Sequence, residues 1–182
     1  MRMRSCESKV VNLARLVRER NKLRKAGRKL VFTNGCFDLL HVGHSDYLGF
    51  ARNQGDALVV AVNSDASVRK NKGKSRPIVP QDERARMLAS LEAVDFVIIF
   101  DDEEPCRLLQ AILPDVLVKG ADWAHYVAGR EIVEQSGGKV VLAPITHGKS
   151  TTGIIEKILG RRSEAIGRRS KADRRSHSAK ES

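Results

Sequence analysis

Two stretches of the chain are apolar without interruption, and they constrain the fold more than any other feature. Leu58 to Val62 reads Leu-Val-Val-Ala-Val, and Phe96 to Phe100 reads Phe-Val-Ile-Ile-Phe. A strand with one solvated face alternates apolar and polar residues, so an unbroken apolar run indicates a strand covered on both faces. The runs therefore predict a mainly parallel sheet with helices on each side.

Further β-rich runs alternate with helical patterns. The predicted strands are Leu30 to Thr33, Ala57 to Asn63, Asp95 to Phe100, Asp115 to Lys119 and Lys139 to Ala143. The predicted helices are His44 to Asn53, Pro80 to Leu91, Glu104 to Leu113 and Ser150 to Leu159. This order predicts an α/β fold, a Rossmann-like doubly wound sheet of about five strands, with its ligand crevice beyond the carboxyl ends of the strands.

Basic residues are concentrated at the two ends of the chain. Residues 1–29 hold eleven Lys and Arg against two Glu, and residues 161–182 hold eight against three acidic residues, whereas the segment between them is slightly acidic. An apolar stripe that includes Val10, Leu13 and Val17 predicts a basic amphipathic helix within residues 1–28, with Gly27 as its C-cap. Residues 29–160 form the predicted folded domain, and residues 161–182 a basic disordered tail.

The net charge of +11 suggests a nucleic-acid-binding protein, but the location of the charge argues against this. The predicted folded domain is not basic, and the tail lacks the interleaved aromatic residues of a single-strand binding platform. A specific nucleic-acid role is therefore not favoured. A basic RNA-binding protein stays open as the non-enzymatic alternative.

The cysteines and the apolar runs bear on localisation. Cys6, Cys36 and Cys106 are odd in number and lack metal-ligand spacing, so they predict neither disulfides nor a zinc site. No apolar run reaches the ~18 residues of a membrane span, and the N-terminus does not resemble a signal peptide. We expect a cytoplasmic protein, with Cys36 serving in packing. The sequence leaves a homo-oligomer possible.

Two histidines follow the first predicted strand at the start of a helix. His41 and His44 are three residues apart, so they lie on one helical face, and Gly43 between them lets a ligand approach the backbone. A helix N-terminus offers free N–H groups and the positive end of a dipole, which favours phosphate binding. Capping or solvated histidines are the alternative interpretation.

Other polar motifs follow the predicted strands at the same edge. They are Asn63-Ser64-Asp65, Lys119-Gly120-Ala121-Asp122 and the segment from Pro144 to Thr152. Within the last of these, Ala143 to Ser150 fits a relaxed P-loop, which we reject because Pro144 follows at once and no later strand offers an Asp for magnesium. Ser150, Thr151 and Thr152 are instead predicted to bind phosphate at a helix start.

The motifs from Thr33 to His44, Lys119 to Asp122 and Gly148 to Thr152 together resemble the cytidylyltransferase-like nucleotidyltransferases. The resemblance is strongest to the D-glycero-β-D-manno-heptose 1-phosphate adenylyltransferases and extends from about Val10 to Leu159. Relatives that make CDP-glycerol carry an Arg where this chain has Ile145, which favours ATP. A CTP-dependent glycerol-3-phosphate cytidylyltransferase remains the alternative.

The resemblance implies that a sugar 1-phosphate attacks the α-phosphorus of ATP and releases pyrophosphate. The implied partners are ATP, Mg²⁺ carried on its phosphates without protein ligands, and an acceptor made by a separate sugar kinase. Because the attacking phosphate is already an anion, no catalytic base is needed. Positioning and charge stabilisation are then the protein's main tasks.

The candidate site residues follow from the motifs and the resemblance. His41, His44 and Lys72 are the predicted catalytic residues. Lys72, Lys74 and Arg76 lie in the basic segment Arg69 to Arg76, which is either a solvated loop or a phosphate clamp; Lys74 and Arg76 are possible further contacts. Arg84 is either an exposed helical ion pair or a phosphate contact. The predicted nucleotide- or phosphate-binding residues are Thr33, Asn34, Gly35, Phe37, Gly43, Asp65, Arg84, Lys119, Gly120, Asp122, Ser150, Thr151 and Thr152.

Overall fold

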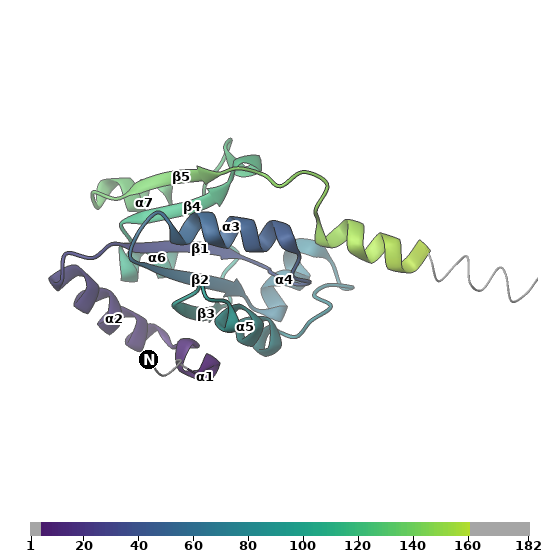
Figure 1. The fold of residues 1–182 in the computed structure, drawn as a ribbon, viewed down its shortest axis with the longest axis horizontal. Coiled ribbons are helices and arrows are strands. Elements are labelled where there is room, and N and C mark those ends of the chain that lie inside the picture. Colours follow the sequence, from purple (N-terminus) through teal and green to yellow (C-terminus); the bar gives the residue numbers. More distant parts are fainter. Residues whose placement is uncertain (1–4, 161–182) are drawn as a thin grey trace, which may run out of the picture. The chain divides into compact units, whose positions relative to one another are not determined.

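The structure, a computed structural model, describes residues 5–160. It divides into two units. The first, residues 1–147, holds a sheet and its helices (Figure 1). The second, residues 148–182, holds a helix over residues 151–160 in its described part. The predicted tail, residues 161–182, lies outside the described residues.

The first unit is built on a five-stranded sheet in the order β3-β2-β1-β4-β5. All four strand pairings are parallel, which confirms the predicted doubly wound sheet. The strands are β1 (Leu30–Gly35), β2 (Ala57–Asn63), β3 (Phe96–Phe100), β4 (Val116–Gly120) and β5 (Lys139–Ala143).

Helices cover both faces of the sheet. α3 (Val42–Arg52) and α5 (Gln81–Ser90) pack on one face, where Leu48 and Leu88 join a cluster with Val60 of β2. α2 (Leu13–Lys25), α6 (Cys106–Ile112) and α7 (Arg130–Gln135) pack on the other face, where Leu16 and Leu109 join Phe32 and Val59 of the strands. The two clusters explain why the central strands are apolar on both sides.

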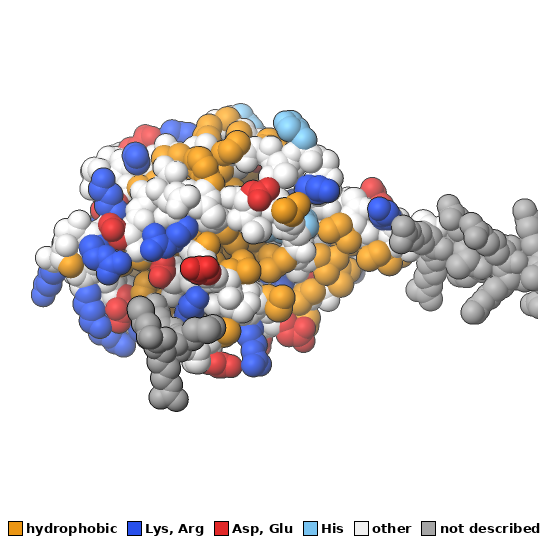
Figure 2. Space-filling model, viewed as in Figure 1, with side chains coloured by type: hydrophobic (Ala, Val, Ile, Leu, Met, Phe, Trp, Pro, Cys, Tyr) orange, Lys and Arg blue, Asp and Glu red, His pale blue; other side chains and the backbone are white. Residues whose placement is uncertain are grey.

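The N-terminal segment is folded onto this unit. α1 (Cys6–Lys9) is followed by Val10, which forms a parallel bridge to Val97, and α2 begins only at Leu13. The predicted stripe is thus split by a short extended piece. α2 ends at Lys25 and its C-cap is Ala26, so the predicted cap at Gly27 is wrong by one residue; Gly27 follows with a φ of +67°. Basic side chains gather over the side where α2 lies (Figure 2).

Two helices were not predicted. α4 (Asp65–Lys72) includes residues expected in a basic loop, so the loop interpretation is wrong for Arg69 to Lys72. The only buried residues of α4 are Ser67 and Val68. Its sequence therefore has no apolar stripe from which a helix could be predicted. α7 is six residues long and buries only Val133. A 3₁₀ turn, η1 (Ala121–Trp123), follows β4.

Candidate active site

Polar residues from three strand ends meet at the carboxyl edge of the sheet. The Lys119 ammonium at the end of β4 donates to the main-chain oxygen of Asn34 in β1, at 3.4 Å. The Arg84 guanidinium of α5 reaches the main-chain oxygens of Cys36 and Asn63, which follow or end β1 and β2. Motifs that lie far apart in the sequence are therefore brought together, as the parallel sheet predicted.

His41 and His44 form a stacked pair at the start of α3. Their ring centroids are 3.9 Å apart and the ring planes differ by 22°. His41 is the N-cap residue of α3. Capping and phosphate binding are therefore not exclusive alternatives for this pair, because the N-cap position itself borders the N–H groups at the helix end.

The His44 imidazole is neutral at physiological pH. Burial, together with the smaller effect of the adjacent His41, lowers the pKa of His44 to about 4. The Nδ1 atom of His44 accepts a long hydrogen bond of 3.4 Å from the backbone N–H of His41. A neutral imidazole that accepts at Nδ1 carries its proton on Nε2, where it can donate to an oxyanion.

Phe37 supports His44 from within a strained turn. Its φ is +47°, and its side chain is buried. The Phe37 and His44 rings are 5.4 Å apart. A Cβ on Gly35 would lie 3.1 Å from the Phe37 ring, so the turn needs a glycine there or a shift of that ring. A non-glycine residue with positive φ costs energy and commonly marks a functional turn. Gly43 lies in the first turn of α3 and is half-buried.

Lys119 is the second residue of the site whose pKa is lowered by burial. Burial lowers the pKa of Lys119 to about 8, and the Asp122 carboxylate opposes that shift. The ammonium lies 5.6 Å from the centroid of the exposed Trp123 ring. A Cβ on Gly120 would collide with an Asp122 oxygen, so glycine allows the tight turn between these two charged residues.

Arg84 is neither an exposed ion pair nor a solvent-facing side chain. It is buried, and its guanidinium also donates to the main-chain oxygen of Val79 and to Asp65 at 2.8 Å. The two sequence alternatives for Arg84 are corrected accordingly, because its donors are directed at protein oxygens in this structure. Asp65 is the ion-pair partner of Arg84.

Thr33 and Arg76 also bond to protein groups. The hydroxyl of Thr33 is buried and lies 2.6 Å from that of Tyr47, which donates to the main-chain oxygen of Val118. Burial raises the pKa of Tyr47 to about 12. Arg76 pairs with Asp38 at 2.6 Å. These residues are part of the framework of the site, and the direct contacts predicted for Thr33 and Arg76 stay predictions.

Two lysines near the site are exposed. Lys72 ends α4 and Lys74 follows Gly73. The Lys72 charge acts on the Cys36 thiol, although burial has the larger effect and raises the pKa of that thiol. Cys36 is therefore a protonated thiol at neutral pH, consistent with the predicted packing role.

The Asn34 Oδ1 atom is buried without a hydrogen-bond partner in the described part of the chain.

The predicted phosphate-binding hydroxyls belong to the second unit. The Ser150 hydroxyl accepts from the backbone N–H of Gly153 at 3.0 Å, the geometry of a helix N-cap. Thr151 and Thr152 occupy the first turn of the helix over residues 151–160. The capping geometry agrees with the expectation, and the phosphate contact stays a prediction.

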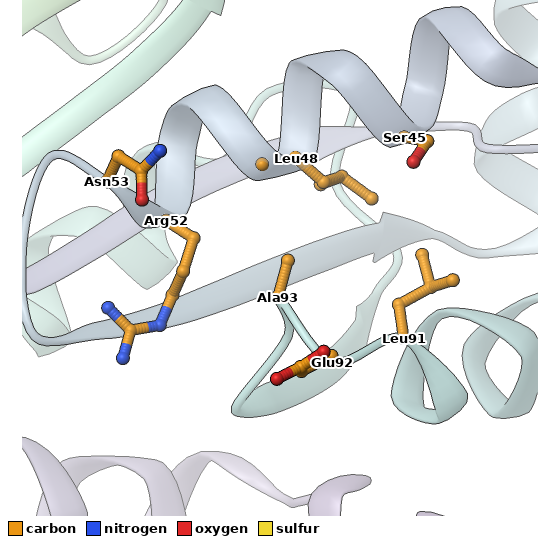
Figure 3. Close-up of a pocket in the computed structure, with 8 residues that line it drawn as sticks. Ser45, Leu48, Arg52, Asn53, Leu91, Glu92 and Ala93 are labelled. Carbon is orange, nitrogen blue, oxygen red and sulfur yellow. The ribbon is translucent and has the colours of Figure 1, made fainter.

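A hollow of about 580 Å³ lies between α3 and residues 91–93. Figure 3 shows Ser45, Leu48 and Arg52 of α3 on one side, opposite Leu91 and Glu92. A smaller hollow of about 170 Å³ shares Ser45 and Leu91 with it and is also lined by His41 and His44. The stacked pair therefore borders accessible space.

Sequence patterns did not reveal two groups that shape the site. Asp38 accepts hydrogen bonds from the segment between α4 and α5, and Tyr47 joins Thr33 to β4. Asp38 lies in the motif that carries the family resemblance, and that was the available signal. Tyr47 had none beyond its place in the helix.

The described residues show neither a metal-binding cluster nor a membrane-spanning helix. Residues 5–160 hold no group of three or more His, Cys, Asp and Glu side chains arranged to bind a metal ion. Within the same residues, no helix combines the length and apolar character needed to cross a membrane.

The stacked imidazole pair at the start of α3 and the parallel sheet agree with the resemblance to nucleotidyltransferases found in the sequence. The profile of the cytidylyltransferase-like family matches residues 32–157, and the chain belongs to that family. Its five-stranded parallel sheet is the Rossmann-like fold expected from the sequence.

Two proteins of known name are similar to most of this chain. The chain is 54% identical over 153 residues to the bifunctional protein HldE of Geotalea uraniireducens (strain Rf4), covering 84% of this chain and 31% of the relative. It is 50% identical over 154 residues to the bifunctional protein HldE of Citrifermentans bemidjiense, covering 84% and 32%. The chain thus spans about a third of these relatives.

A solved structure supports the same assignment. The lipopolysaccharide core biosynthesis protein from Thermoplasma volcanium GSS1 superposes with a TM-score of 0.54 at 30% identity. The match covers 66% of this chain and 98% of that protein. The family and the fold expected from the sequence are both confirmed.

Proposed function

We propose that the chain transfers AMP from ATP to D-glycero-β-D-manno-heptose 1-phosphate, giving ADP-heptose and pyrophosphate. The observation that carries the proposal is the stacked His41–His44 pair with a neutral His44 at the start of α3. It is supported by the family membership and by the similarity to the HldE proteins. The phosphorylated sugar requires a kinase, and we propose that a separate active site provides it.

The chemistry follows from the charges that must be brought together. An oxygen of the sugar phosphate attacks the α-phosphorus of ATP, a bond to that phosphorus forms, and pyrophosphate leaves opposite the incoming oxygen. The attacking group is an anion at neutral pH, so the reaction needs positioning and charge stabilisation more than proton removal. His44 would donate from Nε2 to an oxygen on the α-phosphorus, where negative charge develops.

Cationic groups would reduce the repulsion between the two substrates. Lys119 and Lys72 are proposed as phosphate contacts, one from β4 and the other from the end of α4. Magnesium would arrive with ATP, held by its phosphate oxygens.

The test is a comparison of donor and acceptor pairs. Purified protein is incubated with ATP or CTP and with a set of sugar 1-phosphates or glycerol 3-phosphate, and pyrophosphate release is measured. Release with ATP and the heptose 1-phosphate is expected. Release only with CTP and glycerol 3-phosphate would establish the cytidylyltransferase alternative. No release with any pair, together with tight salt-sensitive RNA retention, would establish the RNA-binding alternative.

A further inference from the structure

Asp38 is a buried carboxylate that the proposed chemistry does not use. It lies after β1 and three residues before His41, and its side chain is 1% exposed. Its oxygens accept from the Arg76 Nε atom at 2.6 Å, from the Ile78 backbone N–H at 2.9 Å and from the Val79 backbone N–H at 2.8 Å. All of these donors belong to the segment between α4 and α5.

The hydrogen bonds keep Asp38 ionised despite its burial. Burial by itself raises the pKa of Asp38, but the N–H groups of Val79 and Ile78 and the Arg76 guanidinium outweigh it and hold the pKa below its usual value. A buried charge that lost these partners would be strongly unfavourable. The carboxylate therefore fixes the position of residues 76–79 relative to the β1 exit.

Arg84 makes a second connection between the same two segments. Its guanidinium donates to the main-chain oxygen of Cys36 in the turn after β1 and to that of Val79 in the α4–α5 segment. The turn that presents the histidine pair and the segment that follows Lys72 are thus bonded together at Asp38 and at Arg84. Residues 73–80 contain no helix or strand, so these bonds define their path.

The connection reaches the lysines through a short stretch of backbone. Lys72 lies four residues before Arg76, and Lys74 lies two residues before it. Both lysines are exposed, and Lys72 is close enough to the turn for its charge to act on the Cys36 thiol. Exposed lysine side chains are flexible, so their usefulness in catalysis depends on where the backbone holds them.

We propose that Asp38 is a positioning residue, which holds the α4–α5 segment against the β1 turn so that Lys72 faces the phosphates bound by the histidine pair. The proposal rests on the proposed nucleotidyl transfer. Asp38 itself touches no substrate in this scheme. It couples two parts of the site, the turn after β1 and the segment between α4 and α5.

The kinetic test is a double-mutant cycle between Asp38→Asn and Lys72→Ala. Asp38→Asn keeps the side-chain shape but removes the charge and turns an N–H toward the Arg76 or backbone donors. Each single substitution is expected to lower kcat about tenfold or more, and the double substitution to lower it little further, since both remove the same lysine contact. Multiplication of the two effects would contradict the proposal.

Asp115→Asn is the matched control. Asp115 also accepts from a backbone N–H, that of Leu30 at 2.7 Å, and from a buried arginine, Arg20 at 3.0 Å, but it lies at the opposite edge of the sheet. It should lower thermal stability with kcat within about twofold of the wild type. An equal loss of kcat in both aspartate variants would show a general structural effect and overturn the positioning role.

Trypsin cleavage gives a readout that does not depend on activity. If Asp38 holds the segment, Asp38→Asn should speed cleavage after Lys72 and Lys74 about fivefold or more, because local opening exposes the backbone. Arg76→Gln, which removes one of the same hydrogen bonds, should speed it less, and Asp115→Asn should not change it. Unchanged cleavage in Asp38→Asn would overturn the inference, whereas absent nucleotidyl transfer in the wild type would overturn only the proposed function.

Discussion

The two edges of the sheet use the same side chains for different purposes. At the amino edge, Asp56, Asp95 and Asp115 directly precede β2, β3 and β4, and each accepts from a backbone N–H at the start of a neighbouring strand. Asp95 and Asp115 also pair with arginines of the helices, Arg52 and Arg20. These contacts align strand starts, and they lie at the edge opposite the histidine pair.

At the carboxyl edge, aspartate and arginine pairs hold loops. Asp38 with Arg76 and Asp65 with Arg84 connect the turn after β1, the end of β2 and the segment before α5. Perturbed groups lie in the same region, since burial lowers the pKa of both His44 and Lys119. The same ion-pair chemistry thus gives register at one edge and places reactive groups at the other.

The largest expected effect is on turnover, and it comes from His44 at the carboxyl edge of the sheet. His44→Ala should lower kcat at least ~10²-fold, because it removes a donor to the charge that develops on phosphorus. The free energy of unfolding should change little, since His44 is only partly buried. Pyrophosphate release and urea unfolding measure the two quantities. Asn53→Ala, at the other end of α3, is the control, and near-normal turnover of His44→Ala would exclude the donor role.

A pH profile tests Lys119, the next largest effect. Its pKa of about 8 means that the ammonium loses its proton as the pH rises above that value. If the charge contacts phosphate, kcat/KM should fall on the alkaline side with an apparent pKa near 8. Lys119→Met should lower kcat/KM about tenfold at neutral pH and remove this limb. An identical alkaline limb in Lys119→Met would assign it to another group.

The framework of the fold could be read from the sequence because its signal is local. The bounds predicted for β2 and β5 coincide with those in the structure, since the β2 run is bounded by Asp56 and Asn63 and the β5 run by Gly138 and Pro144. β1 was predicted to end at Thr33 but continues to Gly35, because backbone pairing with β2 extends beyond the apolar run. Pairing of this kind depends on a distant strand and leaves no local pattern.

The site was predictable in its motifs and unpredictable in its contacts. The stacked histidines and Lys119 follow strand ends, so their convergence could be predicted from the parallel sheet. The partners of Arg84 could not, because they are main-chain oxygens from three separate segments. A sequence does not reveal which main-chain oxygens will lie near a given side chain. Arg84, in a polar helix start, was therefore predicted to be an exposed or ligand-contacting residue.

Mutations at the amino edge should lower the stability of the fold without changing kcat/KM. Asp115→Ala leaves Arg20, which is 3% exposed, without its carboxylate partner. We expect a loss of ~2 kcal/mol, less than for a fully enclosed pair because Asp115 is itself partly exposed. Denaturant unfolding should show this loss while kcat/KM stays within about twofold of the wild type. A tenfold drop in kcat/KM for the folded variant would mean that the two edges are coupled.

The smallest expected effect concerns a residue inside the carboxyl edge that takes no part in its chemistry. Cys36 lies in the β1 turn between charged groups, yet burial raises the pKa of its thiol, so the thiolate is scarce at neutral pH. Cys36→Ala should change kcat less than about twofold and cost ~1 kcal/mol of stability for the lost packing. Pyrophosphate release and thermal unfolding measure these changes. A loss of kcat comparable to that of His44→Ala would show that position within the turn matters more than charge, and would make the whole segment from Gly35 to His41 part of the reacting site.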